Sequence, residues 1–160
     1  MIQASETVDI VLARVDNRLV HGQVGVVWTK AVQATTILVV DKLAAMDYVQ
    51  QEIMNRTVEK HEIEILYWTA DQAKNDLHQL AGKKIFLITR DPIVMNELVV
   101  AGLPIKKVNL GVMHPKIGKR RLTDSFIYVD DHDIKAITNM KEQGIVVSAQ
   151  VLPQQYATFI

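Results

Sequence analysis

Short β-branched, apolar runs alternate along this chain with longer amphipathic stretches, and this alternation constrains the fold more than any other feature of the sequence. Runs of this length and composition form strands rather than helices. Seven of them occur, at Val8–Ala13, Thr36–Val40, Ile63–Tyr67, Lys84–Ile88, Val108–Leu110, Phe126–Val129 and Ile145–Val147. Several are apolar on both faces, which is typical of strands buried in a parallel sheet.

Apolar residues at helical spacing occupy the intervals between these runs. The predicted core-facing positions of five helices are Val24, Val27, Trp28 and Ala31; Met46, Val49 and Ile53; Ala73, Leu77 and Leu80; Val94, Leu98 and Ala101; and Ile134, Ile137 and Met140. Pro92 suits a first helical turn, and Gly144 suits the end of the last helix. We therefore expect a single α/β domain over residues 1–160, with three layers, a mostly parallel central sheet of about seven strands, and helices on both faces.

Composition excludes several classes of function. Lys and Arg together number 18, as do Asp and Glu, so the formal net charge is zero and the chain lacks the cationic excess of a general nucleic-acid binder. The absence of cysteine excludes thiolate catalysis, disulfides and Cys-ligated metal sites. No apolar run approaches the roughly 20 residues of a membrane span, and the N-terminus lacks a signal-peptide pattern, so we expect a cytoplasmic protein.

The loop after the first predicted strand contains the highest density of reactive side chains. Within eight residues it places Arg14, Asp16, Arg18 and His21. The loop follows the carboxyl end of a strand, which is where open parallel sheets bind ligands. Planar guanidinium groups suit phosphate oxygens, and the free amides of a helix beginning just after this loop favour an anion. The combination predicts a phosphate site.

His21 is the candidate nucleophile of this loop, because an imidazole beside an anion site can accept a phosphoryl group on nitrogen. Asp16 would fix the tautomer of that imidazole or orient an arginine. Gly22 and Gln23, at the predicted helix N-terminus, would contribute amides to the bound phosphate. The alternative is a surface ion-pair network of Asp16 and the arginines, in which His21 has no special function.

The segment Gly111–Thr123 is a second candidate, because it is a long basic connection between predicted strands, and long irregular loops are often functional. Its glycines and lysine invite comparison with a P-loop, but six residues separate Gly111 from Gly118 and an arginine follows Lys119, so that motif is absent. The residues of interest are Gly111, Met113, His114, Lys116, Gly118, Lys119 and Arg120. Either the loop presents amides and cations to a phosphate or an acidic partner, or it is only a solvated charged loop.

Other polar positions give weaker signals. Candidates to line the same site at further strand ends are Trp68, Thr69 and Thr89. His132 lies in the acidic run Asp130–Asp133, which a helix N-terminus explains as well as a metal would, and we assign no metal site. The sequence lacks the G-x-G-x-x-G fingerprint of dinucleotide binding, so no nucleotide cofactor is expected.

The segment Arg14–Val24, with the sequence RVDNRLVHGQV, resembles the signature of the enzyme IIB subunits of the mannose/sorbose family. These subunits belong to the bacterial phosphoenolpyruvate-dependent sugar phosphotransferase system. The resemblance extends over nearly the whole chain and includes Val49–Gln51, Lys84–Leu87, Val108–Gly111, Met113–His114 and Tyr128–Asp131. The chain length also agrees with a stand-alone subunit of this family.

The resemblance implies that His21 accepts a phosphoryl group from a phosphohistidine on enzyme IIA and transfers it to a sugar entering through the membrane components IIC and IID. Arg14 and Arg18 match the family's arginines around the phosphoryl group, and Asp16 matches its acidic neighbour. The chain would then be a phosphohistidine–sugar phosphotransferase that needs no cofactor. It would lie in the cytoplasm, bound peripherally to the membrane through IIC and IID, and its basic loop would help to dock IIA.

The segments Arg18–Val26 and Gly111–His114 are most similar to the N-acetylgalactosamine or galactosamine branch of the family. Relatives often carry Asn where this chain has Val112, which removes a polar side chain from that position. Two other hypotheses use the same scaffold. One is a regulatory domain that binds a phosphate or nucleotide ligand without covalent transfer, and the other is an interaction module whose charged loops only dock a partner. The sequence leaves open whether the chain forms a homo-oligomer.

Overall fold

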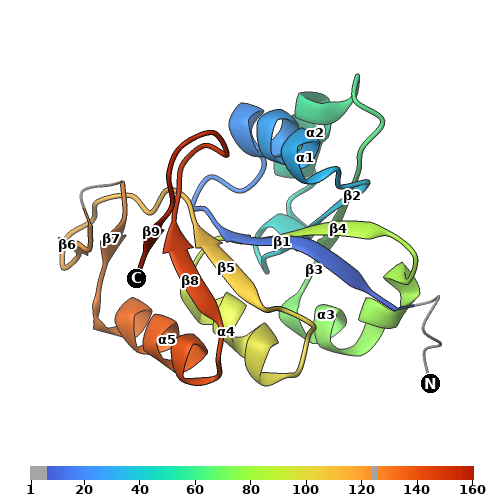
Figure 1. Ribbon diagram of the computed structural model, residues 1–160. Helices are drawn as coiled ribbons and strands as arrows, with labels where there is room; N and C mark the ends of the chain where they lie inside the picture. Colours follow the sequence, from blue (N-terminus) through green and yellow to red (C-terminus); the bar gives the residue numbers. More distant parts are fainter. Residues whose placement is uncertain (1–6, 124–125) are drawn as a thin grey trace.

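The computed structural model describes residues 7–123 and 126–160 and has the three-layer α/β architecture predicted from the sequence (Figure 1). Seven strands form the central sheet in the order β3-β2-β4-β1-β5-β8-β9. Their bounds are β1 Asp9–Val15, β2 Thr36–Val40, β3 Glu64–Trp68, β4 Lys84–Thr89, β5 Lys107–Leu110, β8 Val146–Ala149 and β9 Thr158–Phe159. The neighbouring pairs from β3 to β8 are parallel, and β9 runs antiparallel to β8.

Helices cover both faces of the sheet (Figure 1). One face carries η2 (Gln23–Trp28), which continues as α1 (Thr29–Val32), and α2 (Tyr48–Val58). The other face carries α3 (Ala70–Asp76), α4 (Pro92–Val100) and α5 (Asp131–Glu142). Two short 3-10 helices are η3 (Ala44–Met46) and η4 (Leu77–Leu80). Two clusters of buried apolar side chains fill the two interfaces between the sheet and its helices.

One predicted strand is not part of the central sheet. Within the predicted run Phe126–Val129, only β7 (Tyr128–Val129) is a strand, and it pairs antiparallel with β6 (Arg120–Arg121) in a separate two-stranded sheet. The seventh strand of the central sheet is instead β9. Sequence reasoning misses β9 because two residues after a polar turn carry no alternating pattern.

The first helix begins where the sequence predicts but buries a different set of residues. Gly22 is its N-cap, and Val24 and Trp28 are buried. Val27, predicted to face the core, is 37% exposed, and Ala31 is exposed as well. The physical reason is that η2 is a π-helix, whose wider turn shifts the positions that face inward.

The second helix has an apolar face that points to solvent. Met46, Val49 and Ile53, all predicted to face the core, are 74%, 72% and 63% exposed, so this prediction is wrong. The helix buries Met54 and Val58 instead. Its phase is set by close packing on η2, where a Cβ added to Gly25 would lie only 2.9 Å from Cγ1 of Val58.

The strand order β4-β1-β5 brings three carboxyl-end loops together. Val15 is level with Thr89 of β4 and with Leu110 of β5. Beyond the strands, the amide of Asp16 donates to the Thr89 carbonyl at 3.0 Å, and the amide of Gly111 donates to the Val15 carbonyl at 2.8 Å. The loop after β1 is therefore flanked on both sides by neighbouring loops, at the edge where a doubly wound sheet binds ligands.

Candidate functional site

Arg14 lies within β1 rather than in the loop after it, because β1 ends two residues later than predicted. Its side chain is completely buried. One terminal nitrogen donates to the side-chain oxygen of Asn109 and, at 2.8 Å, to the carbonyl of Gln150. The other donates to Oδ2 of Asp16 at 3.3 Å and to the carbonyl of Val151 at 3.2 Å. Protein acceptors therefore engage both terminal nitrogens of this guanidinium, which orients Asp16, whereas its buried Nε has no partner among the residues that the structure describes.

Asp16 is the centre of the site, and its carboxylate is completely buried. Oδ1 accepts from the amide of Arg18 at 3.0 Å and from its Nε at 3.2 Å. Oδ2 lies 3.3 Å from Nη2 of Arg14 and 3.3 Å from Nε2 of His21. One carboxylate thus joins two arginines and the histidine, and the structure brings these four predicted residues together.

The electrostatics of this cluster favour an anion. Burial opposes ionisation of Asp16, but hydrogen bonds from His21 and Arg18 and the charge of Arg14 outweigh it and lower the pKa of Asp16 to about 2. Burial lowers the pKa of Arg14 to about 10, against the attraction of Asp16. Both groups are therefore charged at neutral pH. With Arg18, two positive charges face one negative charge, and the excess attracts an incoming phosphate.

His21 and Arg18 form the solvent-facing part of the site, with side chains that are 20% and 32% exposed. His21 directly precedes Gly22, the N-cap of η2, and Nη2 of Arg18 lies 3.5 Å from Oε1 of Gln23. The first amides of a helix have no acceptor within the helix, so Gly22 and Gln23 adjoin His21 with groups suited to phosphate oxygens. The segment η2 is a π-helix. Few helices in proteins have this conformation, and those that do are often found at functional sites.

Packing and a strained backbone fix the path of the loop between Asp16 and His21. Leu19 has a φ of 56°, which is uncommon for a residue with a branched apolar side chain. Its side chain is completely buried in the core, next to Val20. Strain of this kind persists only where the surroundings determine the conformation. The burial of Leu19 therefore helps to set the direction in which His21 projects.

Asn17 joins three loops, and sequence reasoning does not select it. Its Nδ2 donates to the carbonyl of Arg90 at 2.8 Å, and its Oδ1 accepts from the amide of His114 at 2.6 Å. Its own amide donates to the carbonyl of Val112 at 2.8 Å. A side-chain amide that both donates and accepts suits such a bridge between two backbones. The only available signal is an amide among charged side chains, which does not reveal its partners.

Replacing Asn17 with alanine is expected to lower the free energy of unfolding by about 1–2 kcal/mol, because Arg90 and His114 each lose a hydrogen-bond partner. Chemical denaturation measures the change. Asn75→Ala, on the exposed surface of α3, is the matched control and should change stability by less than about 0.5 kcal/mol. Faster hydrogen exchange at the His114 amide should accompany the loss. Equal stability of the two variants would contradict the bridging role.

The second predicted loop contributes its first residues to the site. Gly111 lies directly against the guanidinium of Arg14, and His114 is held through its backbone by Asn17. Met113, by contrast, is buried in the core and does not face the site. The loop therefore supports the site mainly through its backbone, a role that its basic composition does not predict.

Two cations of this loop form ion pairs with α5, and a third, Lys116, lines a cavity. Nζ of Lys119 lies 2.7 Å from Oδ2 of Asp133, and Nη1 of Arg120 lies 3.2 Å from Oδ1 of Asp131, so both stabilise the start of α5. Lys116 is exposed, and no ion pair engages it within residues 7–123 and 126–160. It lines a cavity of about 360 Å³ with Asn17, Arg90 and His114. Gly118, at a φ of 86°, makes the turn between Lys116 and Lys119.

Replacing Gly111 with alanine is expected to lower the free energy of unfolding by about 3 kcal/mol. The added methyl group would overlap the guanidinium of Arg14, which is buried and cannot move without losing its partners. Gly22→Ala is the control for stability, because an added Cβ there meets nothing within 4 Å and its φ is −49°. Urea denaturation compares the two. A Gly111→Ala protein as stable as the Gly22→Ala protein would show that Arg14 has room to move.

The three predicted lining residues separate into one that belongs to the site and two that do not. Thr89 is buried at the end of β4, and its carbonyl accepts the amide of Asp16. Trp68 is the last residue of β3 and Thr69 follows it, and β2 and β4 separate this strand from β1. Trp68 packs in the core, and Oγ1 of Thr69 caps α3 by accepting the amide of Gln72 at 3.2 Å. A strand end alone does not indicate the site, because the sheet is wider than the site.

The acidic run Asp130–Asp133 forms a helix cap. Asp130 and Asp133 exchange side-chain to backbone hydrogen bonds at 2.9 Å and 3.1 Å, which is the capping box of α5. Among the residues that the structure describes, no three His, Asp or Glu side chains are grouped so that they could hold a metal ion. The helix cap, one of the two explanations open from the sequence, is the one that this geometry supports.

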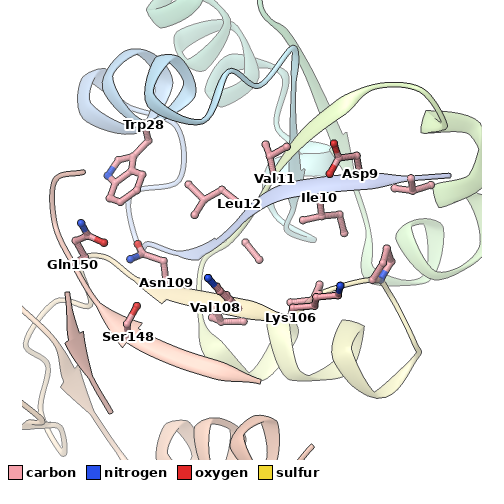
Figure 2. A pocket seen from close by; sticks show the side chains of 15 residues that line it. Asp9, Ile10, Val11, Leu12, Trp28, Lys106, Val108, Asn109, Ser148 and Gln150 are labelled. Carbon is pink, nitrogen blue, oxygen red and sulfur yellow. The ribbon is translucent and has the colours of Figure 1, made fainter. Parts of the chain in front are cut away.

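A cavity of about 500 Å³ is lined by residues of β1, β5 and β8 and by Trp28 of η2 (Figure 2). The ring centroid of Trp28 is 4.9 Å from Cζ of Arg14. Asn109 and Gln150, which hold Arg14, also line this cavity. The cavity therefore adjoins the residues that hold Arg14, and His21 is not one of its lining residues.

Comparison with known proteins gives consistent matches over most of the chain. Residues 10–158 match the family described as "PTS system sorbose subfamily IIB component". The N-acetylgalactosamine-specific phosphotransferase enzyme IIB component 1 of Escherichia coli K12 is 41% identical over 146 residues, 91% of this chain and 92% of that protein. The mannose-specific EIIAB component of the same strain is 31% identical over 138 residues, 84% of this chain and 42% of that protein. The crystal structure of the E. coli N-acetylgalactosamine-specific IIB component 1 superposes with a TM-score of 0.90 at 40% identity, over 95% of this chain and 99% of that chain.

Proposed function

This chain belongs to the sorbose subfamily of IIB components of the sugar phosphotransferase system, and we propose that His21 carries the phosphoryl group that it transfers. One observation supports this choice above the others. His21 is the partly exposed imidazole beside a buried carboxylate and two arginines, at the carboxyl edge of the sheet. A phosphotransferase needs such a nucleophile next to a cationic pocket.

The proposed acceptor atom is Nδ1 of His21. Asp16 is ionised at neutral pH, because its pKa is about 2, and an ionised carboxylate only accepts hydrogen bonds. The imidazole nitrogen facing it, Nε2, must therefore carry a proton. In the neutral imidazole the lone pair is then on Nδ1, and Asp16 fixes this tautomer.

Some of the remaining residues of the site would contact the phosphoryl group, and others would hold those residues in position. Arg18 is exposed enough to bind the phosphoryl oxygens, and the amides of Gly22 and Gln23 would complete the pocket at the start of η2. Arg14 is assigned a positioning role, because its guanidinium is buried and already bonded to the protein. No step requires a cofactor.

The proposed reaction has two steps. The lone pair of Nδ1 attacks the phosphorus of a phosphohistidine on enzyme IIA; an N–P bond forms on His21, and the N–P bond of the donor breaks. A sugar hydroxyl then attacks the same phosphorus, the bond to Nδ1 breaks, and the hydroxyl proton is lost to water. The imidazole regains its lone pair, and Asp16 holds its tautomer through both steps.

The proposed partners are enzyme IIA as the donor and the membrane subunits IIC and IID as the route of the sugar. The chain would then work in the cytoplasm, attached peripherally to the membrane. N-acetylgalactosamine or a related hexosamine is the proposed sugar, since the 41% identical relative is named for N-acetylgalactosamine. His114 and Lys116, which line one cavity beside Asn17, are the proposed docking residues for the donor.

Intact mass spectrometry tests this function. The purified chain is incubated with phosphoenolpyruvate, enzyme I, the histidine phosphocarrier and a cognate enzyme IIA. A single phosphoryl adduct that is lost in acid, and that passes to N-acetylgalactosamine when membranes containing IIC and IID are added, is the expected result. No adduct in the presence of phosphorylated IIA would contradict the proposal and would favour a non-covalent phosphate-binding role.

A further inference from the structure

The ring of Trp28 packs against the buried guanidinium of the charged cluster. Its centroid lies 4.9 Å from Cζ of Arg14, a distance at which the face of an aromatic ring attracts a cation. Arg14 is completely buried and Trp28 is almost so, and this attraction is strongest where both groups are withdrawn from water. The ring therefore stabilises a charge that burial alone would disfavour.

One backbone carbonyl fixes the two side chains relative to each other. The carbonyl of Val151 accepts Nε1 of Trp28 at 2.8 Å and Nη2 of Arg14 at 3.2 Å. Figure 2 shows the ring extending from η2 toward Asn109 and Gln150, which accept hydrogen bonds from the same guanidinium. Trp28 is thus part of the structure that encloses Arg14.

Arg14 in turn determines the position of the carboxylate beside His21. Nη2 of Arg14 lies 3.3 Å from Oδ2 of Asp16, and the same oxygen lies 3.3 Å from Nε2 of His21. The hydrogen bonds of Arg14 act on its terminal nitrogens, whereas the ring of Trp28 limits movement of the whole group toward η2. If the guanidinium moved, Asp16 would lose the contact that orients it toward His21.

Trp28 also connects the charged cluster to the helix that adjoins His21. It is the last residue of η2, and Gly22 and Gln23 at the start of η2 are the proposed source of amides for the phosphoryl oxygens. Trp28 lines the cavity of about 500 Å³ as well. A smaller side chain in its place would extend this cavity to the guanidinium of Arg14, because the ring contacts both.

We propose that Trp28 is a positioning residue for phosphoryl transfer, an inference that rests on the proposed function. Its ring keeps Arg14 where that group orients Asp16, and Asp16 keeps Nδ1 of His21 unprotonated and ready to attack. Trp28 is buried, so it acts through these residues and does not bind the donor. Its loss should therefore lower the rate of the transfer step and leave the affinity for the donor unchanged.

Single-turnover labelling by phosphorylated IIA, at increasing IIA concentration, tests this proposal. Trp28→Met removes the ring and its N–H, and Trp28→Phe keeps an aromatic face. Trp68→Met is the control, because Trp68 is 8% exposed, close to the 5% of Trp28, but belongs to the core cluster across the sheet. Rates are expressed per folded molecule.

The limiting rate should fall at least about tenfold in Trp28→Met, while the half-saturating concentration of IIA stays within about twofold of wild type. Trp28→Phe should recover the rate to within about threefold of wild type, since its ring also attracts a cation. The control should stay within about twofold. Equal rates in Trp28→Met and Trp68→Met, or a loss in Trp28→Met that higher IIA concentrations restore, would overturn the proposal.

The ¹⁵N chemical shifts of the His21 ring provide a readout that a loss of stability does not move. At a pH where the imidazole is neutral, the wild type should show a single tautomer with its proton on Nε2. Trp28→Met should show a mixture of both tautomers, whereas Trp68→Met should match the wild type. A single tautomer retained in Trp28→Met would contradict the positioning role.

A measurement on the wild type alone covers the case in which Trp28→Met does not fold. The Nε–H of Arg14, buried under the ring, should exchange with water far more slowly than that of Arg18, whose side chain is 32% exposed. Equal exchange rates would overturn the proposal. A wild type that is never phosphorylated refutes the proposed function instead, and the tautomer and exchange measurements still decide whether Trp28 positions Arg14 and His21.

Discussion

A His21→Ala protein is expected to acquire no phosphoryl adduct from phosphorylated enzyme IIA, with a rate of transfer at least about a thousandfold lower than wild type. The substitution removes the nitrogen that forms the N–P bond, and among the described residues no other histidine is bonded to Asp16. Intact mass under neutral conditions, compared before and after acid treatment, measures the adduct. Transfer of label to sugar in the presence of the membrane subunits should disappear with it.

His114→Ala is the matched control for this experiment. Its imidazole lies at the same edge of the sheet, but the bond to Asn17 uses the backbone amide, which alanine retains. This variant should form the adduct, more slowly if His114 helps to dock the donor. The thermal stability of His21→Ala should stay near wild type, because its side chain is partly exposed and Asp16 keeps both arginines. An adduct on His21→Ala would show that the wrong residue has been assigned.

Replacing Asp16 with asparagine is expected to lower the free energy of unfolding by about 3–5 kcal/mol and to slow phosphoryl transfer severely. The guanidinium of Arg14 is completely buried, and the substitution leaves its charge without an anion. An amide can donate as well as accept, so asparagine no longer fixes the tautomer of His21 as the carboxylate does. Urea denaturation measures the stability, and single-turnover labelling measures the transfer. Asp71→Asn, in the exposed first turn of α3, is the control and should change neither quantity measurably.

The stability of the wild type should also depend on pH through Asp16. The pKa of Asp16 is about 2 in the folded protein and 3.8 as its ordinary value, so the folded state favours the ionised form. This stabilisation, about 2 kcal/mol, is complete above about pH 5 and is lost as the pH falls through about 2. The difference in the free energy of unfolding between wild type and Asp16→Asn should therefore shrink by about 2 kcal/mol as the pH falls from about 5 to below about 2. A constant difference between them across this range would contradict the assigned pKa.

The fold follows from the sequence because the alternation of strands and helices is regular. The comparisons confirm the family resemblance as well, including the similarity to N-acetylgalactosamine-specific members. Predictions of which residues are buried fail where the local pattern does not determine them. The apolar stripe of Met46, Val49 and Ile53 has helical spacing, and spacing alone does not tell which side of a helix meets the sheet. Here the inner side is chosen by Val58 against Gly25, a contact between residues far apart in the sequence.

For the site as well, the sequence reveals which neighbouring residues belong together but not their contacts with distant segments. The residues Arg14, Asp16, Arg18 and His21 lie together because they are neighbours in one loop, and the sequence is sufficient to group them. It does not reveal that Arg14 is buried, because the groups that bury it come from β5 and from the segment after β8. The sequence also suggests more free positive charge in the second loop than the structure has, because Lys119 forms an ion pair with Asp133 in the cap of the helix that follows.

The hydrogen bonds from Arg14 to the carbonyls of Gln150 and Val151 have a consequence for biosynthesis. Arg14 is translated 136 and 137 residues before these two acceptors. Trp28 also depends on Val151, whose carbonyl accepts its Nε1 at 2.8 Å. The charged cluster therefore closes only after Gln150 and Val151 have been translated. A chain terminated before Gln150 would contain the whole loop and yet leave its arginine charge without these partners, so the loop alone is not a folded site.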